Sequence, residues 1–258
     1  MAPKMKDDFP EISHASRMTW EQNELFQYRD KSLYFNARYV DQDFLDMFTF
    51  ELIEGYLPTA LTDHTSTVIT KDVAVAFFGE ESALGKSFKV ENNHDYQVTA
   101  VIEDIPGNSS YPFNVLLPVE VFIEDNPWAN QWYNNNLRTF LELQPGTDRK
   151  SFNEKIRYYI KENREETTNT EIFLHPYSQI HLYSDFRQGK TGGGRIVYVR
   201  IFSIVALFII VIAAINFMNL ATALSTQRAK EVGIRKIVGS NKLGLIQQLQ
   251  LETWLIAF

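Results

Sequence analysis

Residues 201–220 read IFSIVALFIIVIAAINFMNL, and this stretch decides the fold class of the chain. It contains no Asp, Glu, Lys or Arg, and Ser203 is its single polar residue before Asn216. As an α-helix, 20 residues measure about 30 Å, the thickness of the hydrocarbon layer of a membrane. A buried core helix is the alternative, but such a helix usually carries a polar stripe. The stretch therefore predicts a transmembrane helix, which we place at residues 201–224.

The charges that flank this helix bear on its orientation. Four basic residues precede it and five follow it: Arg187, Lys190, Arg195 and Arg200 before, and Arg228, Lys230, Arg235, Lys236 and Lys242 after. Basic residues favour the cytoplasmic side, and a long domain on the other side contributes little to this bias. We therefore expect the C-terminal side in the cytoplasm and the N-terminal side outside it.

Composition separates the rest of the chain from this membrane end. Residues 1–200 hold 20 basic and 30 acidic residues, a formal charge of −10, whereas residues 201–258 hold five and two, a charge of +3. An acidic soluble part lacks the clustered basic face of a nucleic-acid binder, so we expect no nucleic-acid partner. The chain has no cysteine, which excludes disulfides, thiolate catalysis and cysteine-based metal sites.

Residues 1–190 interleave short strand-like and helix-like stretches, which predicts an α+β domain. The predicted strands, rich in β-branched and aromatic residues, are Leu33–Val40, Thr67–Thr70, Ser87–Val90, Gln97–Ile102, Val115–Leu117, Arg138–Leu143 and Glu171–Leu174. The predicted helices are Asp41–Phe48, Lys71–Phe78, Val119–Glu124 and Arg149–Lys161. The last of these has Asp148 as its capping residue. The glycine-rich segment Gly189–Gly194 is expected to be a flexible hinge before the membrane.

The segment GEESALGKS, at residues 79–87, approaches the phosphate-binding loop pattern of Gly, four residues, then Gly-Lys and Ser or Thr. Here five residues separate Gly79 from Gly85, and the residues after Lys86 favour a strand rather than a helix. A phosphate cradle needs one loop length and a following helix N-terminus. We therefore expect a connection from helix to strand and no nucleotide binding.

Sequence motifs for metal binding and catalysis are weak or absent in this chain. The five histidines are His14, His64, His94, His175 and His181, and they form no close metal-binding pair. The sequence holds no nucleophile elbow and no distinctive pair of carboxylates. We therefore predict no catalytic residue, no cofactor-binding residue and no metal site.

The segment STQRAKEVGIRKIV, at residues 225–238, follows the predicted membrane helix and has a helical pattern. Ser225 is its candidate cap, Glu231 and Arg235 are spaced as an i,i+4 pair, and Gly239 can end it. Apolar and basic residues alternate to form a short basic amphipathic helix. Such a helix can lie on anionic lipid headgroups. It can also dock onto a cytoplasmic partner, and the pattern leaves both open.

From these residues the chain resembles the MacB-like and FtsX-like permease family of ABC transporters. The segment Ile215–Glu252 resembles the family's second membrane helix and its cytoplasmic E-[IV]-G-[IL]-R-[KR] segment. Three upstream segments, Tyr39–Gly55, Val68–Phe88 and Tyr96–Ser110, resemble the MacB-like periplasmic core domain. The resemblance implies an α+β extracytoplasmic domain followed by a transmembrane α-helix and a cytoplasmic amphipathic helix.

The resemblance also implies function and partners. The chain would be a non-catalytic permease subunit that transmits closure of a separate cytoplasmic ATPase to the extracytoplasmic domain, for export or mechanotransmission. Its partners would be that ABC ATPase subunit, a second permease half or a second copy, and membrane lipid in the bacterial inner (plasma) membrane. A periplasmic adaptor can be a further partner. The implied ATPase-coupling residues are Arg228, Lys230, Glu231, Val232, Gly233, Ile234, Arg235 and Lys236.

The implied organisation runs from a domain at residues 1–190, through a juxtamembrane connection at 191–200 and the span at 201–224, to a coupling segment at 225–252. Residues 253–258 resemble the start of a further membrane helix, so we expect a fragment of a longer protein, with its first membrane helix ahead of Met1. The opening residues contain no apolar stretch of the kind that marks a signal peptide.

Two other classes of function remain open from the sequence. A single-pass sensor or binding module needs no ATPase and would end near residue 258. A membrane-tethered hydrolase needs a nucleophile and a base, and the sequence offers no such pair.

Overall fold

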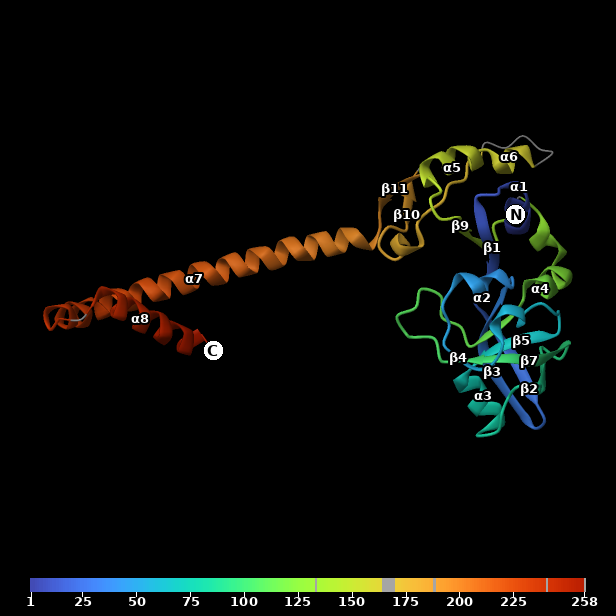
Figure 1. Cartoon of the computed structure of the whole chain (residues 1–258), viewed down its shortest axis with the longest axis horizontal. Helices are drawn as coiled ribbons and strands as arrows, with labels where there is room; N and C mark the ends of the chain where they lie inside the picture. The colour runs from blue at the N-terminus through green and yellow to red at the C-terminus, as the bar shows by residue number, and fades with distance from the viewer. Residues whose placement is uncertain (133, 164–169, 188, 240, 258) are drawn as a thin grey trace. The chain divides into compact units, whose positions relative to one another are not determined.

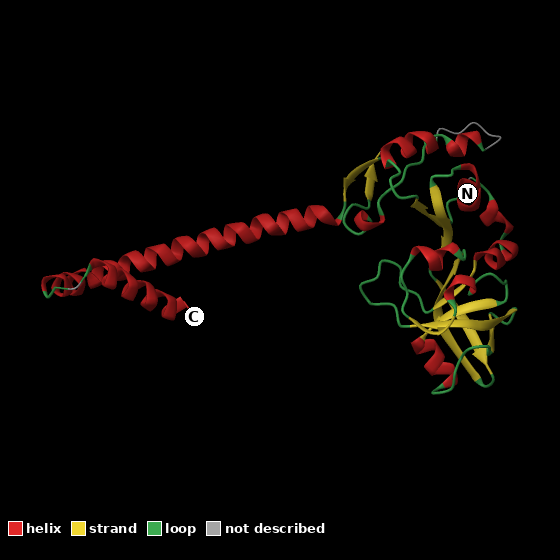
Figure 2. Cartoon of the chain, in the orientation of Figure 1, coloured by secondary structure: helices red, strands yellow, loops and turns green. Residues whose placement is uncertain are grey.

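The structure is a computed structural model that describes residues 1–132, 134–163, 170–187, 189–239 and 241–257. The chain divides into two compact units, Met1–His175 and Pro176–Phe258. The first unit holds a nine-stranded sheet, and the second holds a two-stranded hairpin and two long helices (Figures 1 and 2).

The main sheet closes into a ring. Its strands are β1 (Ile12–Thr19), β2 (Gln22–Tyr28), β3 (Lys31–Val40), β4 (Leu52–Gly55), β5 (Ser66–Thr70), β6 (Ser87–Val90), β7 (His94–Ile102), β8 (Val115–Pro118) and β9 (Leu137–Leu143). The strand order is β2-β6-β7-β5-β8-β3-β1-β9, and β2 also pairs with β3. Six strands therefore form a closed circuit. β1 and β9 extend from it beside β3, and β4 pairs with β7.

The residues of one side of this ring form a single apolar core. Alternate positions of a strand point to the same face, and such positions of β6, β7, β8 and β3 belong to one buried cluster. The strand members of this cluster are Phe26, Ala37, Tyr39, Ile69, Phe88, Val90, Tyr96, Val98, Val101, Val115 and Leu117. Helices α3 (Lys71–Phe78) and α4 (Val119–Asp125) add Val73, Phe77, Phe78, Val119 and Val121 to it.

A second core lies where β1 pairs with β9. Helices α1 (Ala2–Asp8), α5 (Arg149–Ile156) and α6 (Tyr159–Glu162) cover this pair, and Met5, Ile12, Phe152, Ile156 and Tyr159 are buried together. Asp148 caps α5 as predicted, because its carboxylate accepts hydrogen bonds from the backbone N–H groups of Lys150 and Ser151. The remaining short elements are α2 (Asp43–Met47) and the 3-10 turns Leu57–Thr59, Pro127–Asn130 and Tyr177–Gln179.

Most of the predicted strands and helices of the first unit are present in the structure, and some differ. Six of the seven predicted strands are present, but Glu171–Leu174 is not a strand, because Leu174 N–H donates to the side chain of Asn153 instead of to a neighbouring strand. The predicted helix Arg149–Lys161 is divided into α5 and α6, since the carbonyl of Arg157 accepts a hydrogen bond from Ile172 N–H. Strands β1, β2 and β4 and helix α1 were not predicted.

The second unit begins with a hairpin. Strands β10 (Asp185–Arg187) and β11 (Lys190–Gly193) pair in antiparallel fashion, so residues 190–193 form a strand, and the flexibility of Gly189–Gly194 stays a prediction. Gly194 precedes the next helix with φ +114°, and a Cβ there would lie 2.8 Å from the carbonyl oxygen of Leu182. That oxygen accepts a hydrogen bond from Ile196 N–H, so the close approach joins the segment ahead of the hairpin to the helix.

Helix α7 runs without interruption from Arg195 to Ile237, over 43 residues or about 65 Å. Its part Arg195–Leu224 is long and apolar enough to cross a membrane. The predicted helix start at Ser225 is wrong, since no Gly or Pro interrupts α7 before Gly233 and the residues around Ser225 favour helix. Gly239, with φ +98°, follows the end of the helix as predicted. Helix α8 (Lys242–Ala257) then includes most of the predicted apolar segment 253–258.

Candidate functional site

The predicted coupling residues occupy the C-terminal turns of α7 (Figure 1). The side chains of Arg228, Lys230, Glu231 and Arg235 lie outside the described residues. Among the others, Val232 is half-buried, and Gly233, Ile234 and Lys236 are exposed.

This end of α7 presents apolar surface that the described chain leaves uncovered. Ile234, Ile237 and Val238 are 57%, 87% and 81% exposed. Their spacing of three and four residues places them on one face. Nothing lies within 4 Å of a Cβ built on Gly233, so another backbone could approach closely there. Exposed apolar clusters of this kind commonly mark contacts with a protein or a membrane.

The span and this exposed end belong to one helix. Between Leu224 and Val232 the backbone stays helical, and no loop separates the apolar part from the basic part. A movement applied at Ile234 can therefore be carried along α7 as a rigid-body displacement, without a hinge that would absorb it.

The loop at residues 79–87 is the predicted connection from helix to strand: α3 ends at Phe78 and β6 begins at Ser87. Lys86 Nζ lies 2.6 Å from a carboxylate oxygen of Glu81 and 4.8 Å from the ring centroid of Phe78. The Glu81 pKa is lowered by its hydrogen bond with Lys86. The lysine charge is thus compensated within the loop.

We expect no specific binding of Mg-ATP by this loop. A strand follows the lysine, so no helix N-terminus faces a phosphate, and Glu81 would repel one. Calorimetric titration of the chain with Mg-ATP should show no saturable heat. Micromolar binding that Lys86→Ala abolishes would contradict this prediction.

The histidines lie apart from one another in pairs with other groups. His14 contacts Glu142 at 2.7 Å, His94 contacts Asp125 at 2.7 Å, and His64 lies 3.4 Å from Glu124. His181 contacts the guanidinium of Arg195 at 3.2 Å. Within the described part of the chain, no three potential ligands gather as a metal site would require.

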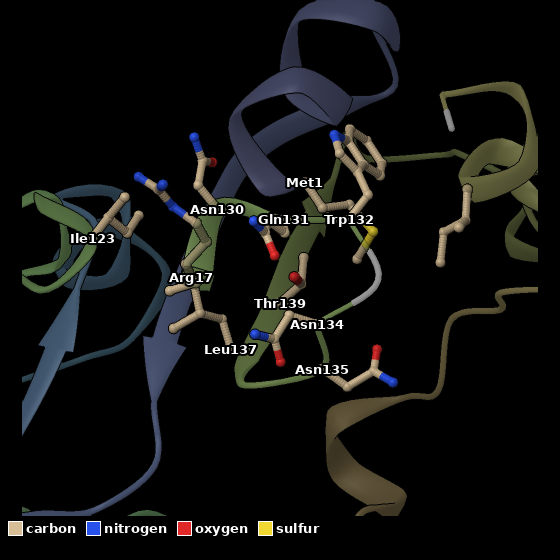
Figure 3. Close-up of a pocket in the computed structure, with 12 residues that line it drawn as sticks. Met1, Arg17, Ile123, Asn130, Gln131, Trp132, Asn134, Asn135, Leu137 and Thr139 are labelled. Atoms are coloured by element: carbon tan, nitrogen blue, oxygen red, sulfur yellow. The ribbon is translucent and has the colours of Figure 1, made fainter. Parts of the chain in front are cut away.

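The first unit contains a polar pocket that the sequence reasoning missed (Figure 3). Its volume is about 110 Å³, and its lining includes Arg17, Asn130, Gln131, Trp132, Asn134, Asn135 and Thr139. The signal was the amide-rich run NQWYNNN at residues 130–136. Arg17 in this lining is already paired with Asp41 and Glu120. Sites for drug-sized ligands measure about 300–1,000 Å³, so this pocket is too small for a ligand of that size.

A ring-shaped sheet with helices, followed by a hairpin and an apolar helix, defines a membrane-attached α+β protein. The family model described as MacB-like periplasmic core domain matches residues 1–159, and the one described as FtsX-like permease C-terminal matches residues 203–258. The first match covers more than half of the chain, so the chain belongs to the MacB-like periplasmic core domain family and carries an FtsX-like permease segment. It is therefore a membrane protein with a periplasmic-type domain ahead of its membrane helix.

A curated relative agrees with this assignment. The macrolide export ATP-binding/permease protein MacB of Aggregatibacter actinomycetemcomitans is 22% identical, over 84% of this chain and 32% of that protein. The chain thus spans about a third of the length of the curated relative it matches.

Two solved structures share the fold of the first unit. A permease-protein domain from Porphyromonas gingivalis is 26% identical and has a TM-score of 0.55, with 64% of this chain and 76% of that chain covered. The extracellular domain of the noncanonic ABC-type transporter YknZ from Gram-positive bacteria has a TM-score of 0.50 at 12% identity, with 68% and 89% covered. The second likeness concerns the fold alone.

Proposed function

We propose that the chain is the permease part of an ABC transporter, which transmits closure of a cytoplasmic ATPase through α7 to the domain at residues 1–190. The observation that carries the proposal is that both matched segments, residues 1–159 and 203–258, lie on one chain. The uninterrupted α7 supports it further, because a helix without a break can transmit force. ATP hydrolysis is assigned to a partner subunit, and the working unit pairs this chain with a second permease half or a second copy.

In this proposal the coupling site is the end of α7, where the predicted coupling residues from Arg228 to Lys236 act together with Ile237 and Val238. Ile234, Ile237 and Val238 supply the apolar contact, and Gly233 supplies the close approach. The neighbouring basic residues suit an acidic rim on the ATPase or the anionic headgroups of the cytoplasmic leaflet. The alternative function, a sensor without transport, would leave this end of α7 with lipid as its only neighbour.

The topology that the proposal requires places residues 1–195 outside the cytoplasm and residues 228–242 inside it, in the bacterial inner membrane. The chain has no cysteine, so single cysteines can be introduced without background. With Asn93→Cys in the full-length protein, an impermeant thiol reagent should label intact cells. With Lys242→Cys it should label only permeabilised cells.

Asn93 is exposed in the turn before β7, whereas Val98 of the same strand is buried. Val98→Cys therefore serves as the control for folding and should stay unlabelled in both conditions. Labelling of intact cells at residue 242 but not at residue 93 would reverse the orientation and remove the permease proposal.

A further inference from the structure

Arg138 of β9 lies close to two aromatic rings. Its guanidinium carbon lies 4.1 Å from the ring centroid of Trp20 and 4.7 Å from that of Tyr111. Its Nη1 donates a hydrogen bond of 2.7 Å to the hydroxyl of Tyr111. Cation–π contacts at these distances are attractive and favour stacking of the planar group. The guanidinium is therefore fixed in orientation before any ligand arrives.

A second arginine, Arg38, also lies near Tyr111. Arg38 of β3 is buried, and its guanidinium carbon lies 5.8 Å from the centroid of Tyr111. Its three nitrogens bond to the carbonyls of Pro112 and Thr19 and to Glu21. Burial, opposed by Glu21 and assisted by Arg138, lowers the pKa of Arg38. Arg38 thus has a structural role, and it adds positive charge beside Tyr111.

The two guanidiniums are incompletely neutralised within the described part of the chain. Glu21 lies 3.5 Å from Arg38 and is itself 58% exposed. Arg138 forms no ion pair with the described residues, and its buried Nε has no hydrogen-bond partner there. Arg17, in contrast, contacts two carboxylates. The cluster of Trp20, Arg138, Tyr111 and Arg38 therefore retains an excess of positive charge in a domain that is acidic as a whole.

We propose that Trp20 and Arg138 form a docking site for a carboxylate side chain of a partner protein. Because the Nε of Arg138 is buried, the carboxylate is met by the terminal N–H groups, which a guanidinium presents side by side in one plane with the geometry that a carboxylate accepts. Trp20 is 52% exposed, and exposed Trp beside Arg and Tyr is the composition of the energetically dominant residues of protein interfaces.

The surrounding charge restricts the partner further. Because residues 1–200 carry a formal charge of −10, a long acidic stretch would be repelled. The ligand is therefore a short segment with one or two carboxylates, and a phosphate backbone is excluded. The inference does not depend on the transport proposal, since neither residue belongs to α7.

The test uses the full chain in detergent and two short fluorescent peptides, Gly-Glu-Gly-Glu-Gly with two carboxylates and Gly-Gln-Gly-Gln-Gly with none. Saturable binding of the Glu peptide is expected, with the Gln peptide bound much more weakly. Arg138→Lys keeps the charge but loses the stacked plane, so it should weaken binding about tenfold. Trp20→Ala should weaken it as well, with an unchanged melting temperature for both variants.

The chain offers a matched control in Arg157, which lies 5.9 Å from the ring centroid of Tyr158 but is already paired with Glu154 and Glu171. Arg157→Lys should bind the Glu peptide as the unchanged chain does. Absence of saturable binding, equal affinity for the Gln peptide, or an equal loss in Arg157→Lys would overturn the proposal. Competition by sodium acetate at the same carboxylate concentration would assign the site to small carboxylates and would also overturn it.

Discussion

Gly233→Leu in the full-length permease is expected to reduce stimulation of the cognate ATPase by about tenfold or more, because the leucine side chain would keep the partner's backbone from its docked position. Within the described chain, nothing lies within 4 Å of a Cβ at this position, so leucine fits without displacing any described residue. Leucine also favours helix over glycine by up to about 1 kcal/mol. A loss of coupling would therefore arise at the contact with the partner. ATPase activity and co-purification of the two subunits measure it.

Gly244 in α8 is the matched control, because it lies outside α7 and outside the predicted coupling residues 228–236, is also exposed, and has nothing within 4 Å of a built Cβ. Gly244→Leu adds the same apolar area and should leave coupling unchanged. If both leucine variants lose coupling, the effect belongs to added apolar surface in general and not to docking at Gly233.

Glu231→Lys separates a docking helix from a lipid-bound one. On anionic lipid each basic residue contributes about 1 kcal/mol of attraction, so this reversal should strengthen attachment. At a protein contact with specific charges, the same reversal should weaken coupling. Wild-type coupling in both Gly233→Leu and Glu231→Lys would contradict docking and favour a helix that lies on the membrane surface.

Asp41→Asn is expected to lower the free energy of unfolding by about 2–4 kcal/mol, because it leaves a buried guanidinium without its main counter-charge. The side chains of Arg17 and Asp41 are each only 13% exposed. Asp41 accepts hydrogen bonds from Arg17 Nε at 3.0 Å and from the backbone N–H of Arg17 at 2.5 Å. It thereby joins the end of β3 to β1. Denaturant or thermal unfolding of the chain in detergent measures the loss.

Glu120→Gln tests whether burial of the ion pair determines how much unfolding free energy is lost. Glu120 contacts the same guanidinium at 2.8 Å but is 42% exposed, so water replaces its contribution more readily. The expected loss is about 1 kcal/mol or less. Equal losses for the two variants would mean that the pair with Asp41 has no special role in joining the strands.

Local patterns in the sequence were sufficient for several features. The charge-free stretch at 201–220 indicated the membrane helix, Asp148 indicated the start of α5, and the extra residue between Gly79 and Gly85 argued against a nucleotide loop. Each of these three features depends on residues that are close to one another in the sequence. The continuity of α7 past Ser225 also depends on local sequence, since residues 195–232 contain no Gly or Pro that would end a helix.

The tertiary structure alone decided which distant segments meet. β2 has few apolar residues in alternation, and it became a strand because β3 and β6 pair with it on both sides and close the ring. Trp20, Tyr111 and Arg138 come together because β1 pairs with β9 and the segment between β7 and β8 brings Tyr111 beside Arg138. Periodicity in a sequence encodes which face of an element is buried, whereas strand partners and register depend on contacts between segments that are far apart in the chain.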